Sequence, residues 1–239
     1  DELFIFMETQ SIGENGKIKA YKTKDLNSFE DLGIILKEDY HLSYPYVFKN
    51  KSEFFLIPES QKANEINLYK FKNFPFNPLK LKTLLHGNFF DSSLINFNNV
   101  WYLFTTTKNG LEIYWSEDFL FNEFKPHPMN PITNDDRFAR SAGAPLFIDE
   151  KFYRFSQNCS TSYGENINIL KINRLDKLNY KEDILIENFF KKELNWNSLG
   201  GHHINIVNFK KKYIVAVDGQ SKDYLINKYL SFFIKKLFN

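Results

Sequence analysis

The sequence predicts an all-β protein, a five-bladed β-propeller with an incomplete first blade and a short C-terminal helix. Three observations support this fold class. A short aromatic and aliphatic run recurs five times, a second apolar segment and a polar turn precede four of the copies, and a third segment of alternating polarity follows most of them. The interval between copies is about 50 residues, which lies in the range of propeller blades.

The recurring run has the composition of a strand, because aromatic and aliphatic residues dominate it. Its five copies are residues 3–6, 54–57, 101–104, 152–155 and 213–216. Since nothing precedes the first copy, we expect the first blade to lack its innermost strand. No linker rich in Gly, Ser or Pro divides the chain, so residues 1–222 are predicted to form one propeller domain.

The segments around each run complete a predicted blade. The apolar segments that precede the last four runs, each forming a predicted β-hairpin with its run, are 46–48, 93–95, 145–148 and 204–207. The third strands are predicted at 17–21, 66–71, 111–115 and 167–172. Strand, turn, strand, turn and strand at a constant period indicate sheets arranged radially around an axis.

The pattern changes at the C-terminus, where residues 223–239 are predicted to form a helix packed on or following the propeller. Apolar residues recur there near helical spacing, with lysines between them. A basic amphipathic helix can also lie on a membrane surface. Docking against its own domain is the favoured interpretation.

Composition restricts the class of protein. With 43% hydrophobic residues and a net charge of +2, the chain can build a core and has no overall charge that favours a nucleic acid. It contains no apolar run near the ~20 residues of a membrane span. The single cysteine, Cys159, cannot form an internal disulfide, so we expect a reducing compartment and a cytoplasmic location. Because Asp1 opens the chain without an initiator Met or a signal-peptide pattern, we expect a processed or trimmed protein.

The candidate functional site lies at the starts of the predicted hairpins. In a propeller the innermost strands surround a central channel, and ligands sit at one mouth of it. The four segments that lead into these strands are polar or small where a structural strand would be apolar, as expected of a functional site. They are residues 41–45, 90–93, 140–145 and 200–203.

Two sets of motifs resemble known families. Asp-Ser-Ser-Leu at 91–94, followed by Trp-Tyr-Leu-Phe at 101–104, resembles the repeated pattern of the five-bladed propeller superfamily of arabinanases, levansucrases and invertases, which is similar to glycoside hydrolase family 43. His-Leu-Ser-Tyr-Pro at 41–45, Ile-Pro-Glu-Ser at 57–60 and Arg-Ser-Ala-Gly at 140–143 resemble, more closely, the N-terminal domain of glucosamine inositolphosphorylceramide transferases and its bacterial relatives. Some of those relatives are fused to formyltransferase-like domains. The similarity covers nearly all of the chain.

The resemblance implies a set of carboxyl groups around a sugar. In the hydrolases a general-base Asp on the first blade, a pKa-tuning Asp on the third and a general-acid Glu on the fourth surround the substrate. Such pairs protonate the leaving oxygen and activate water. Asp91 matches the second position, whereas the first position would precede Asp1. Gly143 stands where the acid is expected, which puts hydrolysis by the usual residues in doubt.

Other carboxyl groups are candidates for the missing catalytic role beside Asp91. Glu59 follows the second run and is a relocated acid, a group that binds sugar hydroxyls or a carboxylate that caps strand-end amides. Glu165 either points into the channel or lies on a solvated turn, the latter being favoured. Glu8 ends the first run as Glu59 ends the second, so the same two readings apply more weakly.

The remaining candidate site residues are expected to bind the ligand or a metal ion rather than to take part in the chemistry. The guanidinium of Arg140 suits a carboxylate or phosphate, with a buried ion pair to Asp91 as the alternative. His41 and Tyr44 are predicted to line the sugar site, unless Tyr44 belongs to the core. Of His202 and His203, neighbours on a strand, only one is expected to face the channel. The resemblance implies that this histidine helps to hold a central divalent cation such as calcium, and a packed histidine is the alternative.

These observations predict a carbohydrate-active domain. It would bind a sugar or nucleotide-sugar at the channel and act in glycosyl transfer or hydrolysis during cell-surface glycan biosynthesis or modification. One alternative is a noncatalytic glycan-recognition module that serves a fused or partner enzyme, such as an upstream glycosyltransferase or formyltransferase-like domain. A second alternative is a protein-interaction propeller that uses its rim, which would leave the polar inner strands unexplained.

Overall fold

The computed structural model describes residues 1–221 and 233–236. Their strands form five antiparallel sheets, in each of which neighbouring strands follow one another along the chain. Three sheets have four strands. They are β4 (Ser43–Asn50), β5 (Glu53–Glu59), β6 (Glu65–Asn73) and β7 (Phe76–His86), then β8 (Phe90–Phe97), β9 (Val100–Thr107), β10 (Gly110–Ser116) and β11 (Lys125–Pro126), then β12 (Ser141–Ile148), β13 (Lys151–Asn158), β14 (Asn166–Leu175) and β15 (Tyr180–Ile186).

The first and last sheets have three strands each. They are β1 (Leu3–Thr9), β2 (Lys17–Thr23) and β3 (Glu30–Leu36), and β16 (Ile204–Phe209), β17 (Lys212–Val217) and β18 (Phe233–Lys236). The helical content of the described residues is two 3₁₀ turns, η1 (Gln61–Ala63) and η2 (Asn195–Asn197), and none of their helices is long and apolar enough to cross a bilayer.

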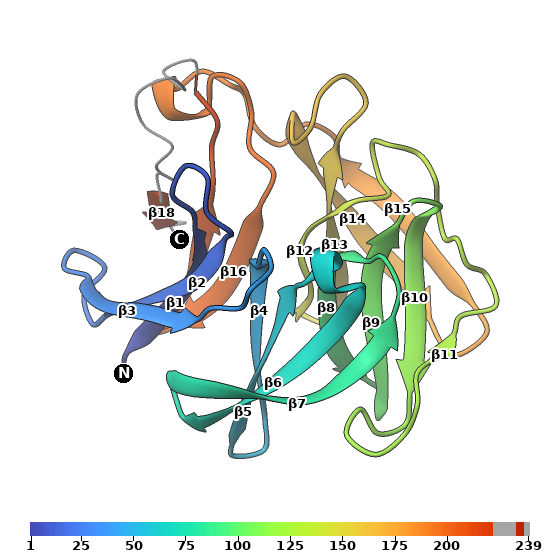
Figure 1. The fold of residues 1–239 in the computed structure, drawn as a ribbon. Coiled ribbons are helices and arrows are strands. Elements are labelled where there is room, and N and C mark those ends of the chain that lie inside the picture. The colour runs from blue at the N-terminus through green and yellow to red at the C-terminus, as the bar shows by residue number, and fades with distance from the viewer. Residues whose placement is uncertain (222–232, 237–239) are drawn as a thin grey trace.

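The sheets surround a common axis, as Figure 1 shows. Their first strands contact one another in turn, β1 with β4, β4 with β8, β8 with β12 and β12 with β16. This is a β-propeller arrangement, which confirms the predicted all-β class. The predicted number of five blades is not confirmed, because only three of the described sheets have the four strands of a full blade.

The predicted hairpins and third strands are confirmed. The five aromatic runs lie in β1, β5, β9, β13 and β17, and the last four pair with the strands before them. The third strands are β2, β6, β10 and β14. The outer strands β3, β7, β11 and β15 had no prediction, because their outward position leaves many of their side chains exposed and their polarity irregular.

The core consists of four apolar clusters, each between two consecutive sheets. On β5, Phe55 packs toward the third sheet, and its neighbour Leu56 packs toward the first. On β9, Leu103 faces the second sheet and Phe104 the fourth. Since successive side chains of a strand point to opposite faces, a strand between two sheets must be apolar at every position. This explains why the runs are continuous rather than alternating.

The C-terminal helix prediction is partly wrong. Four of its residues, Phe233–Lys236, form β18, which pairs with β17 in an antiparallel register. A strand here pairs with the backbone N–H and C=O groups at the edge of β17, which a helix would leave without partners. The rest of the range 223–239 lies outside the described residues.

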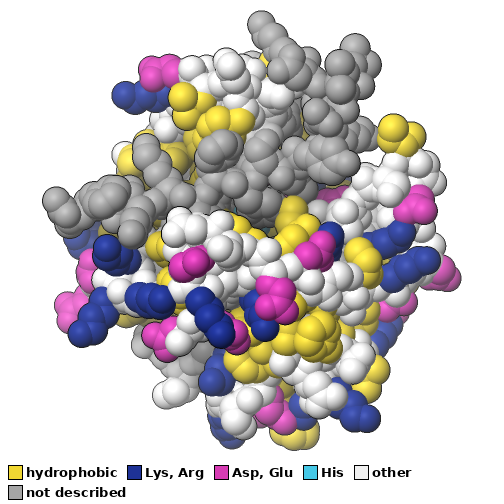
Figure 2. Space-filling model, turned by 90° about the vertical axis from the view of Figure 1, so that its left-hand side faces the viewer, with side chains coloured by type: hydrophobic (Ala, Val, Ile, Leu, Met, Phe, Trp, Pro, Cys, Tyr) yellow, Lys and Arg dark blue, Asp and Glu magenta, His cyan; other side chains and the backbone are white. Residues whose placement is uncertain are grey.

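Charge on the face next to the first sheet is mixed. Figure 2 shows lysine and acidic side chains side by side on this face. Lys19 lies 2.7 Å from Asp31, and Lys22 lies 3.2 Å from Glu30. These ion pairs are consistent with the small net charge of the chain. They leave no patch of positive charge for a polyanion on the described part of this face.

The packing between sheets predicts the effect of truncating a core ring. Phe55 is fully buried and lies against Phe48 and Phe119 at centroid distances of 5.4 and 5.3 Å. Phe55→Ala should lower the free energy of unfolding by about 3–5 kcal/mol in urea denaturation. The matched control is Phe121→Ala at a ring that is 84% exposed, which should change it by less than about 0.5 kcal/mol. Equal losses in the two variants would contradict this core.

Candidate functional site

Irregularities in the inner strands build the site. The pairing of β4 with β5 shifts register between Ser43 and Tyr46, and that of β8 with β9 shifts between Phe90 and Ser93. β12 carries similar shifts after its first residue. Such bulges add a residue and redirect side chains. The bulged inner strands thus belong to the second, third and fourth sheets.

Two site residues adopt the left-handed region inside these bulges. Tyr44 has a φ of 41° and Asp91 a φ of 49°. Residues other than Gly seldom adopt positive φ, and such strain is concentrated at functional sites. Both residues keep this strained backbone conformation, which turns their side chains toward the channel mouth.

A pocket of about 460 Å³ occupies this mouth. Its ionisable and polar lining comes from all five sheets and from the loops between them. Among the lining residues are Glu8, His41, Tyr44, Glu59, Asp91, Arg140, Gln157, Tyr163, His202, His203 and Asp218. The structure therefore brings together every site residue that the sequence predicted except Glu165.

Asp91 and Arg140 form the centre of the pocket. The Nε of Arg140 donates to Oδ2 of Asp91 at 2.7 Å, and Nε2 of Gln157 donates to the same oxygen at 3.3 Å. The guanidinium lies between the rings of Phe90 and Tyr163, 5.1 and 4.9 Å from their centroids. Arg140 therefore lines the pocket and also forms the ion pair that the sequence left as an alternative.

Glu59 lies directly against this pair. Its Oε2 accepts the backbone N–H of Asp91 at 3.1 Å and lies 4.0 Å from Nη2 of Arg140. Burial, with the neighbouring charge of Asp91, raises the pKa of Glu59 to about 8. Glu59 thus caps a backbone amide and is also held as a neutral acid at pH 7. The two carboxyl groups therefore lie in one local environment.

His202 is oriented by Asp218. One oxygen of Asp218 accepts the backbone N–H groups of His202 and His203 at 2.8 and 2.7 Å, and the other pairs with Nδ1 of His202. Burial lowers the pKa of His202, but the contact with Asp218 and its charge outweigh burial, so the net shift is upward. Asp218 thus fixes the orientation of the imidazole ring, and its Nε2 atom is available to a ligand.

Both histidines line the pocket, so the expectation that only one faces the channel is wrong. They precede β16 rather than lie within it, and the alternation of side chains holds only along a regular strand. His203 packs edge to face on Tyr44, 5.2 Å between centroids, and burial lowers its pKa.

Glu8 and His41 form a further pair across the mouth. The backbone N–H of Gly16 donates to Nδ1 of His41 at 2.9 Å, so the ring proton sits on Nε2. That nitrogen lies 3.4 Å from Oε1 of Glu8. Burial raises the pKa of Glu8, and the nearby His41 lowers it by less.

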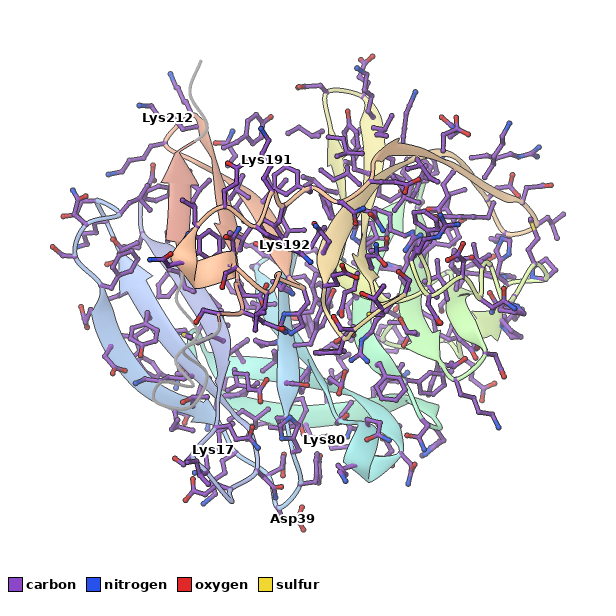
Figure 3. All side chains as sticks on the ribbon, turned by 90° about the horizontal axis from the view of Figure 1, so that it is seen from above. Lys17, Asp39, Lys80, Lys191, Lys192 and Lys212 are labelled. Carbon is purple, nitrogen blue, oxygen red and sulfur yellow. The ribbon has the colours of Figure 1, made fainter. Side chains whose placement is uncertain are left out.

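Glu165 does not line this pocket. Its carboxylate contacts the hydroxyl of Thr161 and lies 3.2 Å from Nζ of Lys192, which Figure 3 labels. These contacts lower the pKa of Glu165. A carboxylate already paired in this way outside the pocket gives no support to the predicted catalytic role.

The close packing of β12 on β16 explains the glycine at the expected acid position. A Cβ added to Gly143 would lie 2.0 Å from the carbonyl oxygen of Ile204. No side chain fits there unless the two inner strands separate. The missing acid is therefore a consequence of backbone contact, and another carboxyl group must supply any proton.

The expected metal does not fit the described residues. Among residues 1–221 and 233–236, no three His, Cys, Asp or Glu side chains converge closely enough to hold an ion. Asp218 already pairs with His202, and His203 lies against an aromatic ring. We therefore assign no chemistry in this pocket to a calcium ion.

The sequence missed Gln157, Tyr163 and Asp218. Asp218 directly follows β17, as Glu8 and Glu59 stand at the ends of β1 and β5, and Gln157 is near the end of β13. Aligning the residues after each aromatic run would have found Gln157 and Asp218, because equivalent positions of the repeats meet at the same mouth. Tyr163 lies on a loop without such a pattern.

The raised pKa of Glu59 predicts a pH-dependent stability. The folded protein binds this proton more tightly than the unfolded chain, so the stabilisation is complete below pH ~4.5 and is lost as the pH rises through about 8. Relative to Glu59→Gln, the wild type should lose about 2–4 kcal/mol of unfolding free energy between pH 5 and 8.5. Urea denaturation at several pH values measures this difference. A constant difference across the range would contradict a buried neutral Glu59.

Comparison with known proteins gives one family match and several structural matches. The family model of the N-terminal part of glucosamine inositolphosphorylceramide transferase 1 matches residues 1–220. The enzyme of that name from Arabidopsis thaliana is 35% identical over 235 residues, and that from Oryza sativa subsp. japonica is 36% identical over 220. These matches cover 92% and 86% of this chain, but only 31% and 29% of the relatives.

Solved structures agree with the fold. An exo-1,5-α-L-arabinanase from a bovine ruminal metagenomic library matches with a TM-score of 0.65 and 13% identity, covering 98% of this chain and 89% of that one. An endo-arabinase from Bacteroides thetaiotaomicron matches with a TM-score of 0.65 and 14% identity, covering 100% and 90%. At such low identity these matches show the propeller fold alone.

Proposed function

Since this chain belongs to the N-terminal family of glucosamine inositolphosphorylceramide transferase 1, we propose that it binds a sugar or nucleotide-sugar at the mouth of the propeller and takes part in glycosyl transfer. The names of the relatives support a carbohydrate-related function. The chain spans about a third of their length, so the activity of a whole protein of this kind involves residues beyond this domain.

One observation carries the proposal, namely the buried carboxyl of Glu59 beside the ion pair of Asp91 and Arg140. A neutral acid in a pocket can protonate a leaving oxygen, and it takes the place of the acid that Gly143 excludes. The ion pair contributes fixed charges for sugar hydroxyls or for the phosphate of an activated sugar. Tyr163 and Tyr44 add apolar surface for a sugar ring.

The step that we propose moves one proton in each direction. The bond between the anomeric carbon and the leaving oxygen breaks, and that oxygen takes the proton of Glu59. The attacking hydroxyl forms the new bond at the anomeric carbon and gives its proton to Nε2 of His202, which Asp218 holds in place. The protein groups that change charge are Glu59, which loses a proton, and His202, which gains one. No group is oxidised or reduced.

A noncatalytic glycan-recognition module is the second candidate, and the contacts of the two acids favour it. In a hydrolase the two carboxyl groups flank the scissile bond, whereas here the carboxyl of Glu59 bonds to the backbone of Asp91 and the carboxyl of Asp91 pairs with Arg140. In this case the domain would hold a glycan for a catalytic domain fused to it or bound to it. Both candidates use the same pocket, and turnover distinguishes them.

The test combines binding with turnover. Isothermal calorimetry with glucosamine and with its uridine-diphosphate conjugate should detect binding, and Arg140→Ala should weaken it at least ~10-fold by leaving Asp91 buried and unpaired. Glu59→Gln keeps the shape of the side chain, so it should bind within ~3-fold of wild type and lose turnover by ~10²-fold or more.

The matched control is Glu165→Gln, which lies outside the pocket and should change neither quantity. Binding without turnover in the wild type would support the recognition module instead. If neither ligand binds to the wild type, or if Arg140→Ala binds as well as wild type, the pocket is not the sugar site.

A further inference from the structure

One sequence position recurs in all five repeats, five residues after the start of each aromatic run. Its residues are Glu8, Glu59, Thr106, Gln157 and Asp218. All of them except Thr106 line the pocket, because equivalent positions of a repeat meet at the same mouth. Three of the five are acids, whereas Gln157 carries an amide of the same length as glutamate. An amide differs from a carboxylate in that it donates hydrogen bonds.

The side chain of Gln157 is buried and joins two sheets. Its Nε2 atom donates to Oδ2 of Asp91 at 3.3 Å and to the backbone carbonyl of Ser141 at 2.8 Å. Asp91 belongs to β8 of the third sheet, and Ser141 begins β12 of the fourth. A carboxylate at position 157 could only accept hydrogen bonds and would face the carboxylate of Asp91. The contacts therefore require the amide.

The backbone of Gln157 holds the other member of the ion pair. Its N–H donates to the carbonyl oxygen of Arg140 at 2.8 Å. The Nε of Arg140 in turn donates to the same oxygen of Asp91 that accepts from the side chain of Gln157. Gln157 thus fixes the backbone of Arg140 and the carboxylate of Asp91 relative to each other.

Thr106, the other neutral residue at this position of the repeat, also contacts the segment around Arg140. Its hydroxyl donates to the carbonyl of Ala139 at 3.4 Å and accepts the N–H of Ser141 at 3.3 Å. The two neutral residues therefore hold the start of β12 in place, whereas the three acids line the pocket.

The orientation of Asp91 decides what Glu59 faces. The charged groups beside Glu59 are Asp91 and Arg140, and the charge of Asp91 adds to burial in raising the pKa of Glu59. If the carboxylate of Asp91 turned away, Glu59 would remain buried and would lose that neighbouring charge. Because Arg140 and Gln157 both donate to Oδ2, the carboxylate cannot turn without breaking both hydrogen bonds.

We propose that Gln157 is a positioning residue of this site, which holds the carboxylate of Asp91 in the orientation that pairs with Arg140 and faces Glu59. It acts through Asp91 rather than on the ligand. This inference rests on the proposed function, because it explains how the acid of that function keeps its neighbour in place.

The test follows the carboxyl carbon of Glu59 by ¹³C NMR titration in Gln157→Met. Methionine keeps the length of the side chain and removes both donors. Once released, the carboxylate of Asp91 can turn toward the open pocket, so the midpoint of Glu59 should fall by at least ~1 pH unit relative to wild type. A midpoint that is unchanged or higher would contradict the positioning role.

The matched control is Asn168→Leu. Asn168 is a buried amide of β14 in the same sheet, and it donates to the carbonyl of Arg137 at 2.6 Å but has no hydrogen bond to Asp91. Both variants lose buried hydrogen bonds, so both should lower the melting temperature. Only Gln157→Met should move the midpoint of Glu59. Equal shifts in the two variants would show that lost stability, not positioning, moves it.

Two further measurements isolate the contact with Asp91. Adding Gln157→Met to Asp91→Asn should not move the midpoint of Glu59 any further, because the residue through which Gln157 acts has already changed. A second readout keeps Gln157 unchanged and follows its two Nε2 protons by NMR. One resonance should move in Asp91→Asn, and the other, which is bound to Ser141, should stay. If neither moves, the inference fails.

The outcomes separate the two proposals. A wild-type midpoint near pH 8 that Gln157→Met leaves unchanged overturns the role of Gln157, and the proposed function stands. A wild-type midpoint near 4.5 removes the neutral acid and with it both proposals. Because the titration uses no ligand, the absence of sugar binding overturns the proposed function alone.

Discussion

The contact between Glu59 and Asp91 is the constraint on which the site depends. The bulge in β8 gives Asp91 a positive φ, and in this conformation its backbone N–H reaches the carboxyl of Glu59 at the end of β5. Burial, together with the neighbouring charge of Asp91, raises the pKa of Glu59, so this acid keeps its proton while Arg140 pairs with Asp91. The strained backbone of β8 thus places Asp91 against Glu59, whose carboxyl group is neutral at physiological pH.

The same close packing around the axis that brings these groups together also removes the acid expected on the fourth sheet. The first strands of consecutive sheets contact one another, and the approach of Ile204 leaves no room for a side chain at Gly143. Glu59 of the second sheet and His202, which Asp218 holds in place, are among the titratable groups that line the pocket. The propeller architecture resembles that of the arabinanases.

Much of the fold could be predicted because burial on both faces leaves an apolar run in β1 and in the second strand of each of the other four sheets. Outer strands such as β7 and β15 lack that signal, since solvent tolerates any polarity at their exposed positions. Asp91, Arg140 and Glu59 stood out as polar residues near inner strands. Glu165 lies on a loop outside the pocket, which agrees with the favoured reading of a turn and gives no support to a catalytic role. The expectation of a single channel-facing histidine failed because loop conformation, not strand periodicity, directs those side chains. The pairing of His202 with Asp218 joins residues that only the folded hairpin brings together.

The central claim is that Glu59 keeps its proton at pH 7. It is tested most directly by ¹³C NMR titration of the Glu59 carboxyl carbon in wild type and in Asp91→Asn, assigned with Glu59→Gln. The account predicts a midpoint near pH 8 in wild type and a lower midpoint once the neighbouring charge is removed. A wild-type midpoint near the ordinary value of 4.5, unchanged by Asp91→Asn, would contradict it.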